Sequence, residues 1–173
     1  MTAASLFVLG GARSGKSRYA QVRAETAAGN LVFVATAEAF DDEMRDRIAR
    51  HRADRDARWR TVEAPRDLPA TIDTLRGGES VVLVDCLTLW VSNLLLADAD
   101  IARAGRELCT AIGRFDGTLI LVANEVGLGI VPDNALARRF RDAAGQLNQA
   151  VAAVAGEVVL LTAGLPFTLK PRA

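Results

Sequence analysis

Five short apolar runs, spaced along the chain, restrict the possible fold more than any other feature. Each is rich in Val, Leu and Ile and almost continuous, which is typical of strands buried on both faces of a sheet. The runs are SLFVLG (5–10), LVFVA (31–35), SVVLVD (80–85), TLILVA (118–123) and EVVLLT (157–162). Helical patterns separate them, and this alternation predicts an α/β fold with a mostly parallel, doubly wound sheet.

The clearest of the intervening helices follows Pro132–Asp133. Apolar residues there recur at steps of three or four and form one stripe on a helix of about 20 residues. The stripe consists of Leu136, Phe140, Ala143, Leu147, Val151 and Val154. We expect Asp133 to be the N-cap of this helix. The chain contains no internal repeat, low-complexity tract or linker, so its 173 residues are expected to form one domain, 1–173.

Composition narrows the class of protein. Lys and Arg number 21 and Asp and Glu number 21, so the net charge is zero and gives no reason to expect a nucleic-acid or membrane partner. The longest apolar run, residues 81–97, is interrupted by Asp85 and Asn93 and is shorter than the roughly 20 residues of a membrane span. The N-terminus has no signal-peptide pattern. Cys86 and Cys109 form no spacing motif, which fits a reducing cytoplasm.

The segment GGARSGKS (10–17) follows the first predicted strand and opens a predicted helix. It matches the phosphate-loop pattern G-x-x-x-x-G-K-[ST], with Gly10, Gly15, Lys16 and Ser17 in the fixed positions. Glycines let the backbone bend around phosphates, while inward N–H groups and the helix end attract the anion. Lys16 is one of only two lysines, and its slim point charge suits a phosphate better than a guanidinium fork. A Gly-rich turn that binds nothing is the alternative.

Carboxylates follow two of the predicted strands, at the sheet edge where ligands bind in such folds. Asp85 ends the run 80–85 and is, with Ser17, a candidate ligand for Mg²⁺. The same residue is also placed to cap the next helix. Glu125 follows the run 118–123, where it would polarise a substrate hydroxyl, hold a metal or cap the loop.

The basic stretch RIARHRADR (47–55) contains the only histidine of the chain. On a helix, Met44, Ile48, His51 and Arg55 would share one stripe, so His51 would lie on the apolar face. An unprotonated imidazole there could attack phosphorus, and neighbouring positive charges favour the neutral form. Taken alone, the stretch favours the alternative, a half-buried histidine with a structural role.

Among other phosphate-loop proteins, GTPase switches, motor ATPases and regulatory subunits fit this sequence poorly. A GTPase switch would need an N-K-x-D guanine reader and a D-x-x-G motif, but the chain reads NEVG after 118–123 and DCLT from Asp85. RecA-type motor ATPases usually run longer and carry nucleic-acid-binding loops. A small-molecule kinase fits the size and the motif. A regulatory subunit that binds GTP without turnover would need a nucleotide-state sensor, which is not visible.

Together the motifs resemble one family, the bifunctional adenosylcobinamide kinase/adenosylcobinamide-phosphate guanylyltransferases of cobalamin biosynthesis. The residues that carry the resemblance follow the family's order over nearly the whole chain. They are GGARSGKSR (10–18), ATAEAFDDEMRDRIARHR (35–52), WRTVEAP (59–65), VDCLTLWVSNLL (84–95), NEVGLGIVPDNALARRFRD (124–142) and AGLP (163–166). The resemblance implies a RecA-like P-loop NTPase fold, assembled as a homotrimer in the cytoplasm.

The resemblance also implies two reactions. The first phosphorylates adenosylcobinamide with ATP or GTP. The second transfers GMP from GTP to adenosylcobinamide phosphate and gives adenosylcobinamide-GDP and pyrophosphate. In the family this second reaction passes through a guanylylated histidine, whose position here is His51. The expected catalytic residues are therefore His51 and Lys16, and the expected Mg²⁺ ligands are Ser17 and Asp85.

The family's nucleotide contacts map onto seventeen positions of this sequence. They are Gly10, Gly11, Ala12, Arg13, Ser14, Gly15, Lys16, Ser17, Ala35, Thr36, Ala37, Arg52, Ala53, Asp54, Arg55, Glu63 and Asp85. Two departures from the family pattern stand out. Some members have glutamate in place of Asp85, and some have two adjacent histidines where this chain has Arg50 and His51.

Overall fold

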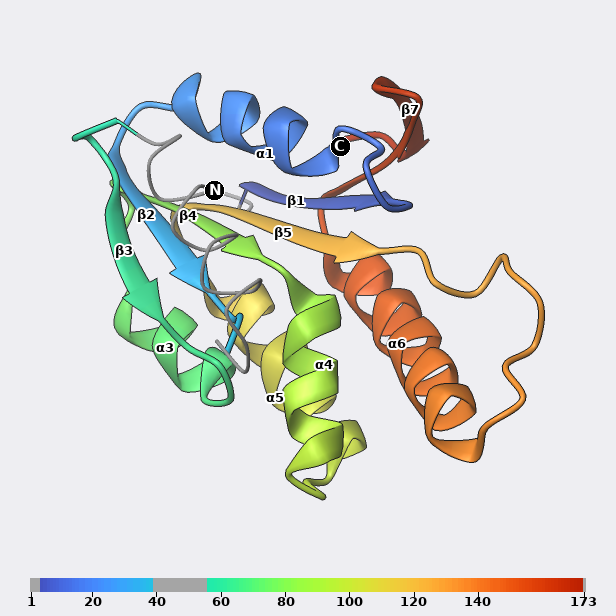
Figure 1. Ribbon diagram of the computed structural model, residues 1–173. Helices are drawn as coiled ribbons and strands as arrows, with labels where there is room; N and C mark the ends of the chain where they lie inside the picture. Colours follow the sequence, from blue (N-terminus) through green and yellow to red (C-terminus); the bar gives the residue numbers. More distant parts are fainter. Residues whose placement is uncertain (1–3, 39–55, 173) are drawn as a thin grey trace.

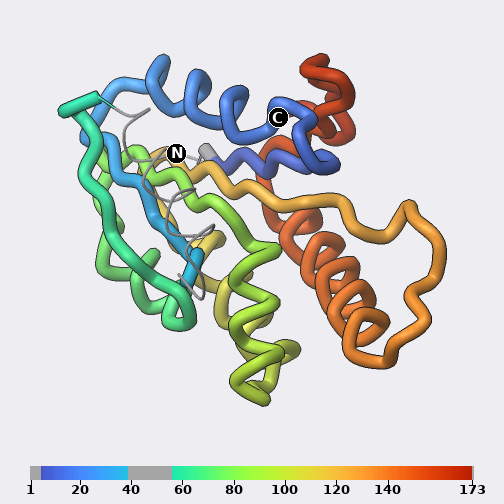
Figure 2. The backbone as a smooth tube through the Cα atoms, in the orientation of Figure 1, coloured from blue at the N-terminus to red at the C-terminus, as the bar shows by residue number. Residues whose placement is uncertain are grey.

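One seven-stranded sheet forms the centre of the molecule, with helices on both faces (Figures 1 and 2). The computed structural model describes residues 4–38 and 56–172. The strand order is β3-β2-β4-β5-β1-β6-β7, and every neighbouring pair is parallel except β6 and β7. The strands are β1 (Ala4–Gly10), β2 (Asn30–Ala35), β3 (Arg60–Glu63), β4 (Ser80–Asp85), β5 (Thr118–Asn124), β6 (Glu157–Thr162) and β7 (Leu165–Lys170). The predicted mostly parallel α/β fold is confirmed.

All five predicted runs are strands, and the structure adds two at the edges of the sheet. β3 has only four residues, and β7 is exposed along most of its length. Only Ala163 and Gly164 form the turn between β6 and β7, which begins at Leu165. Both turn residues have positive φ, 52° and 78°, as the type I′ form of a two-residue hairpin turn requires.

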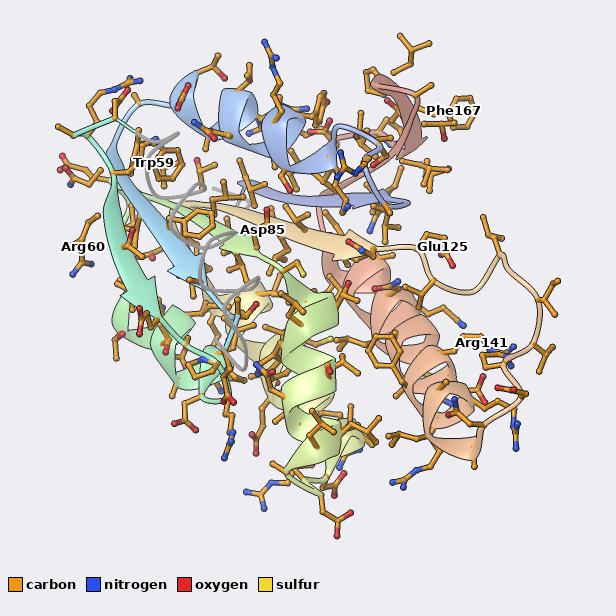
Figure 3. All side chains as sticks on the ribbon, viewed as in Figure 1. Trp59, Arg60, Asp85, Glu125, Arg141 and Phe167 are labelled. Carbon is orange, nitrogen blue, oxygen red and sulfur yellow. The ribbon has the colours of Figure 1, made fainter. Side chains whose placement is uncertain are left out.

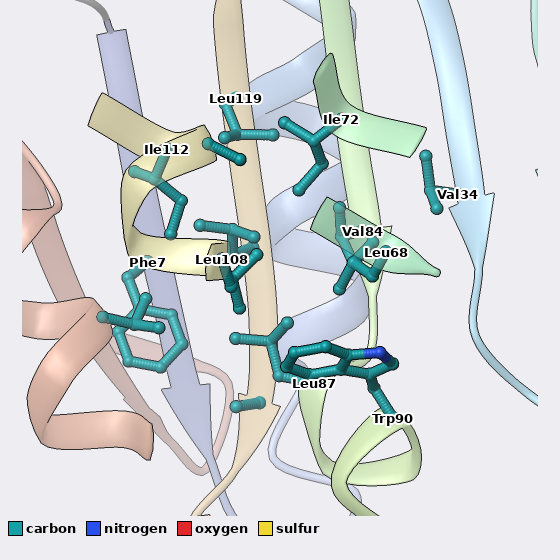
Figure 4. Close-up of a cluster of buried hydrophobic side chains, with 14 of the residues drawn as sticks. Phe7, Val34, Leu68, Ile72, Val84, Leu87, Trp90, Leu108, Ile112 and Leu119 are labelled. Carbon is teal, nitrogen blue, oxygen red and sulfur yellow. The ribbon is translucent and has the colours of Figure 1, made fainter. Parts of the chain in front are cut away.

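The helices lie in two layers. Among the described residues, α1 (Lys16–Glu25) covers one face of the sheet, and four further helices cover the opposite face (Figure 1). These others are α3 (Leu68–Thr74), α4 (Leu87–Leu96), α5 (Ile101–Arg114) and α6 (Ala135–Val154). The larger core lies under this second layer, where Leu68, Trp90 and Leu108 pack toward the strands (Figure 4). Trp90 is completely buried, whereas Phe167 on β7 is 66% exposed.

The start of α6 differs from the sequence-based expectation by one residue. Asn134 is the N-cap, and its side-chain oxygen accepts a hydrogen bond from the Ala137 N–H at 2.7 Å. The prediction that Asp133 is the cap is therefore wrong. Asp and Asn cap helices about equally well, so sequence alone does not separate two adjacent candidates.

The stripe of α6 is buried only in its middle. Leu147 and Val151 are buried, but Leu136 and Val154 at the two ends are 51% and 43% exposed. No helix in the described part of the chain is long and apolar enough to cross a membrane. The seven strands share one sheet, and the single domain over 1–173 stays a prediction.

After two neighbouring central strands, β1 and β5, the chain continues on opposite faces of the sheet. β1 pairs with β5, and β1 is followed by α1 on one face while β5 is followed by α6 on the other (Figure 1). Such a switch point leaves a crevice at the carboxyl ends of the two strands, where ligands of open α/β sheets bind. The phosphate loop follows β1 at this place.

Candidate nucleotide-binding site

The backbone of the phosphate loop is shaped to receive an anion. Arg13 and Gly15 both have positive φ, 56° and 90°, within the turn that joins β1 to α1. Alternation of left-handed and right-handed residues points successive N–H groups into one concavity. Gly15 is the N-cap of α1 and has no side chain to cap the first N–H groups of the helix. These donors and the positive end of α1 therefore face the same place.

Lys16 folds back across the loop it follows. Its side chain is buried, at 9% exposure, and Nζ donates a hydrogen bond to the Gly11 carbonyl at 3.1 Å. This puts the ammonium over the loop, where the phosphates of a nucleotide are cradled in proteins with this motif. The geometry fits the expected role of Lys16.

Ser14 contributes a buried hydroxyl to the same loop. In residues 4–38 and 56–172, its Oγ is the buried side-chain polar atom without a hydrogen-bond partner. A Cβ at Gly10 would overlap this Oγ and would lie 2.9 Å from the Leu161 carbonyl oxygen. The loop is therefore packed closely onto the end of β6, which explains glycine at position 10. A buried hydroxyl without a partner is what a bound phosphate or an ordered water would satisfy.

Two neighbouring segments fix the loop from either side. The Gly164 N–H, in the turn between β6 and β7, donates to the Ser14 carbonyl at 2.9 Å. The Glu125 N–H, just after β5, donates to the Gly10 carbonyl at 3.1 Å. Sequence reasoning missed both contacts, although AGLP (163–166) was one of the motifs that resembled the family. The resting shape of the loop is thus set by the residues around it.

Asp85 lies at the carboxyl end of β4 (Figure 3). The N-cap of α4 is Cys86, so the alternative that Asp85 caps this helix is wrong. Its role as a metal ligand stays a prediction, as does that of Ser17 in the first turn of α1. No trio of His, Cys, Asp or Glu gathers as a metal site within 4–38 and 56–172. Mg²⁺ usually takes one or two protein ligands and completes its shell with substrate phosphates and water, which suits this sparse pair.

The sheet register brings three of the predicted contact residues into one row. Ala35 at the end of β2 pairs with Glu63 of β3 on one side and with Asp85 of β4 on the other. Thr36, the next residue, is fully buried. Its hydroxyl donates to the Cys86 carbonyl at 2.7 Å and accepts from the Cys86 N–H at 2.9 Å. Thr36 therefore holds the ends of β2 and β4 together, and a direct nucleotide contact from it or from Ala37 stays a prediction.

Two further groups at the carboxyl edge of the sheet, the candidate Glu125 and the thiol of Cys86, are explained by their surroundings. Glu125 lies at the end of β5 beside the phosphate loop (Figure 3), and its carboxylate accepts a hydrogen bond from the Gly127 N–H at 2.7 Å. This side chain therefore caps its own loop. Burial raises the pKa of the Cys86 thiol to about 11, so it stays protonated and is a poor nucleophile at neutral pH.

The expected nucleophile and its neighbours are not among the described residues. His51 and the contacts assigned to Arg52, Ala53, Asp54 and Arg55 lie outside them, and so do Met44 and Ile48. Their roles stay predictions. The described chain stops at Glu38 and resumes at Asp56.

Residues 6–169 match the family described as cobinamide kinase/cobinamide phosphate guanyltransferase. The chain belongs to this family. The protein is therefore a transferase. It is 48% identical over 165 residues to the bifunctional adenosylcobalamin biosynthesis protein CobP of Pseudomonas aeruginosa, covering 94% of this chain and 95% of the relative. It is 41% identical over 180 residues to CobU of Salmonella typhimurium, a protein of the same description, covering 95% and 99%.

Solved structures support the fold at much lower identity. The chain resembles the protein PH0250 from Pyrococcus horikoshii with a TM-score of 0.58 and 10% identity, covering 98% of this chain and 87% of that one. It also resembles an ATPase of a bacterial type III secretion system with a TM-score of 0.57 and 11% identity, covering 93% and 51%. The second likeness places the chain among folds of P-loop NTPases.

Proposed function

We propose that this family member phosphorylates adenosylcobinamide with ATP or GTP and then guanylylates the product with GTP, as the family resemblance implies. The observation that carries the proposal is the phosphate loop, whose left-handed residues, overlying Lys16 and unpartnered Ser14 hydroxyl form a cradle for a nucleotide. The names of the relatives support the cobalamin pathway.

The first reaction needs little covalent chemistry from the protein. The hydroxyl oxygen of adenosylcobinamide attacks the γ-phosphorus, a P–O bond forms, and the bond to the β-phosphate oxygen breaks. The nucleoside diphosphate leaves with the electron pair, and the hydroxyl proton passes to solvent. The loop N–H groups and Lys16 neutralise the charge on the phosphates, and positioning supplies much of the remaining acceleration.

The second reaction breaks a different bond of GTP and is proposed to use His51. An imidazole nitrogen attacks the α-phosphorus, so an N–P bond forms and the bond between the α- and β-phosphates breaks. Pyrophosphate leaves with the electron pair and takes up the proton that the ring loses. A phosphate oxygen of adenosylcobinamide phosphate then attacks the same phosphorus. The N–P bond breaks, its electron pair returns to the ring nitrogen, and a proton from solvent restores the histidine. Two such steps let one phosphate cradle serve both half-reactions.

The residues present fit a magnesium–nucleotide complex. Ser17 and Asp85 would hold Mg²⁺, which neutralises phosphate charge when bound. Some family members have glutamate in place of Asp85. The aspartate side chain is shorter by one methylene group, so its carboxylate reaches less far.

We also propose that the enzyme acts as a cytoplasmic homotrimer on adenosylcobinamide and its phosphate, without nucleic-acid or membrane partners. The described surface includes large apolar side chains that an assembly would cover, among them Leu128, Ile130 and Phe167 at 88%, 97% and 66% exposure. Sedimentation equilibrium at several protein concentrations tests the trimer, and a monomeric mass throughout would contradict it.

Isotope transfer separates the proposal from its rivals. With γ-labelled GTP, label should move to adenosylcobinamide, and with α-labelled GTP it should move to adenosylcobinamide phosphate. A simple small-molecule kinase would transfer only the γ-label. A GTP-binding regulatory subunit would bind the nucleotide and release no pyrophosphate.

Lys16 variants test the cradle. Lys16→Ala should lower both transfer rates by roughly 10²-fold or more, because one phosphate site serves both reactions. Lys16→Arg keeps the charge and should rescue little, because a guanidinium fork is bulkier than the ammonium that folds over Gly11. Full kinase turnover in either variant would contradict the assignment.

A further inference from the structure

The motif NEVGLGIVP (124–132), which begins at the end of β5, has two polar side chains, those of Asn124 and Glu125. The carboxylate of Glu125 accepts a hydrogen bond from the Gly127 N–H and caps its own loop. Asn124 is partly buried, and its side-chain amide makes no hydrogen bond within residues 4–38 and 56–172. A structural hydrogen bond therefore explains the carboxylate of this motif but not the amide.

The main chain at Asn124 is fixed by contacts with three other segments. Thr88 Oγ1 of α4 accepts a hydrogen bond from the Asn124 N–H at 2.7 Å. Asn148 Nδ2 of α6 donates to the Asn124 carbonyl at the longer distance of 3.5 Å. The next N–H along the chain, that of Glu125, donates to the Gly10 carbonyl at the start of the phosphate loop. The place of Asn124 is thus set by its main chain, while its side chain is left to bind a ligand.

The side chain of Asn124 lies on the face of the sheet that α1 covers. Side chains alternate between the two faces along a strand. Ile120 and Val122 of β5 belong to the core cluster that contains Ala20 of α1. Asn124 follows them at the same spacing of two residues, so its amide lies on the α1 face. The phosphate loop leads into α1 on this face.

Asp85 lies on the same face, one strand away. β5 is between β4 and β1 in the sheet (Figure 1). Leu83 of β4 packs in the core beneath α1, and Asp85 follows it by two residues. Gly10 pairs with Asn124, and Asp85 pairs with Val122. Neighbouring strands lie about 4.8 Å apart, so the amide is between the phosphate loop and the candidate magnesium ligand, one strand spacing from each.

This is where the terminal phosphates of a nucleoside triphosphate would lie. In proteins with the phosphate-loop motif, the lysine reaches the β- and γ-phosphates. Metal ligands of the kind proposed for Ser17 and Asp85 also lie beside these two groups. An amide nitrogen carries two N–H donors, and hydrogen bonds to a charged acceptor are stronger than those between neutral groups. The amide of Asn124 therefore has the chemistry that a phosphate oxygen at this place needs.

We propose that the side-chain amide of Asn124 donates a hydrogen bond to the terminal phosphate of the bound nucleotide, and so distinguishes a nucleoside triphosphate from a diphosphate. The inference rests on the proposed function, in which the phosphate loop binds the nucleotide. Both proposed reactions begin with a triphosphate, and the first releases a diphosphate. A group that contacts only the third phosphate favours binding of the substrate over binding of this product.

Two matched nucleotides test the proposal, because they differ only in the terminal phosphate. They are α,β-methylene GTP and α,β-methylene GDP, used with Mg²⁺ and without a corrinoid acceptor. The methylene bridge blocks cleavage between the α- and β-phosphates, and without an acceptor the γ-phosphate is not transferred, so calorimetric titration measures binding alone. Asn124→Ala should bind the triphosphate about tenfold or more weakly than the wild type and bind the diphosphate equally well.

Asn148→Ala is the matched control. It removes the same kind of side chain from a residue beside the same strand end, but from α6 on the opposite face of the sheet. The affinities for both nucleotides should stay at their wild-type values. A control that lost affinity for the triphosphate alone would show that the effect does not need the α1 face, and would overturn the inference.

The other outcomes are distinct. Equal weakening of both nucleotides by Asn124→Ala, or wild-type affinity for the triphosphate, would overturn the inference. Wild-type protein that binds neither nucleotide would contradict the nucleotide cradle of the proposed function itself. Where Asn124→Ala does not fold, as judged by circular dichroism, Asn124→Ser replaces it, because its short hydroxyl also removes the amide. The serine variant should show the same selective loss, and an unchanged ratio of the two affinities would overturn the inference.

Discussion

The two lysines of this arginine-rich chain occupy positions that suit a compact charge. Lys16 folds over the phosphate loop, and Lys170 lies at the far end of the chain. Lys170 Nζ donates to the carbonyls of Ala152, Ala153 and Ala155 at 3.2, 3.1 and 2.6 Å. These carbonyls are at the carboxyl end of α6, where helices leave acceptors unsatisfied and favour a positive charge. The three N–H donors of one lysine ammonium fit these three carbonyls better than the planar guanidinium of an arginine would.

Lys170→Met should therefore destabilise the fold. Three carbonyls lose their partner, and we expect the free energy of unfolding to fall by about 1–3 kcal/mol. Urea denaturation measures the change, and Lys170→Arg should recover only part of it. A Met variant as stable as the wild type would contradict the capping role.

Gly10→Ala should disturb the phosphate loop directly. The new methyl group would overlap Ser14 Oγ and press on the Leu161 carbonyl, so we expect a loss of about 1–3 kcal/mol in stability together with weaker GTP binding. Thermal unfolding and nucleotide titration measure the two effects. Gly113→Ala is the control, because its methyl group meets no atom within 4 Å. Normal GTP binding by Gly10→Ala would show that the loop tolerates a side chain there.

At the level of helices and strands, the predictions from sequence were right for the strands that are buried on both faces. Central strands are covered on both faces, so their apolar runs are continuous and were predicted with nearly the right bounds. The edge strands β3 and β7 lack such runs because solvent reaches them, and they were missed. The phosphate loop was predicted because its chemistry depends on residues that are close together in the sequence. The contacts of Ser14 with Gly164 and of Asn93 with Thr36 join distant segments, which no local pattern encodes.

An ion pair between α1 and β6 gives the fold a pH dependence. Arg23 Nη1 and Nη2 donate to the two carboxylate oxygens of Glu157 at 3.0 and 2.7 Å, and Nη1 also donates to the Tyr19 hydroxyl. The hydrogen bonds from Arg23 outweigh burial and hold the pKa of Glu157 below its ordinary value of 4.5. A lowered carboxyl pKa stabilises the fold above that ordinary value, and the contribution is lost as the pH falls through the folded-state pKa.

Glu157→Gln should accordingly lower the free energy of unfolding at pH 7 by at most about 1 kcal/mol, since Arg23 is partly exposed to solvent. The difference from wild type should shrink as the pH falls below 4.5 and the wild-type carboxylate takes up its proton. Denaturation curves at a series of pH values measure it. A difference that stays constant into acid would contradict the assignment to charge.

At the scale of the whole molecule, two separate parts of the carboxyl edge of the sheet have different proposed roles. The phosphate loop lies at the β1/β5 switch point, while Ala35, Glu63 and Asp85 form a row across β2, β3 and β4. Many functions share the P-loop fold, so the fold alone does not decide the reaction. Membership of the family and the proposed use of His51 distinguish this chain from an ordinary kinase.

The central claim is that His51 carries GMP between GTP and the acceptor. Mass spectrometry of the protein after exposure to GTP and Mg²⁺, followed by peptide mapping under neutral or basic conditions, tests it most directly. We predict a GMP adduct on His51 that disappears when adenosylcobinamide phosphate is added. An adduct on another residue, or turnover to adenosylcobinamide-GDP by His51→Ala at the wild-type rate, would contradict it.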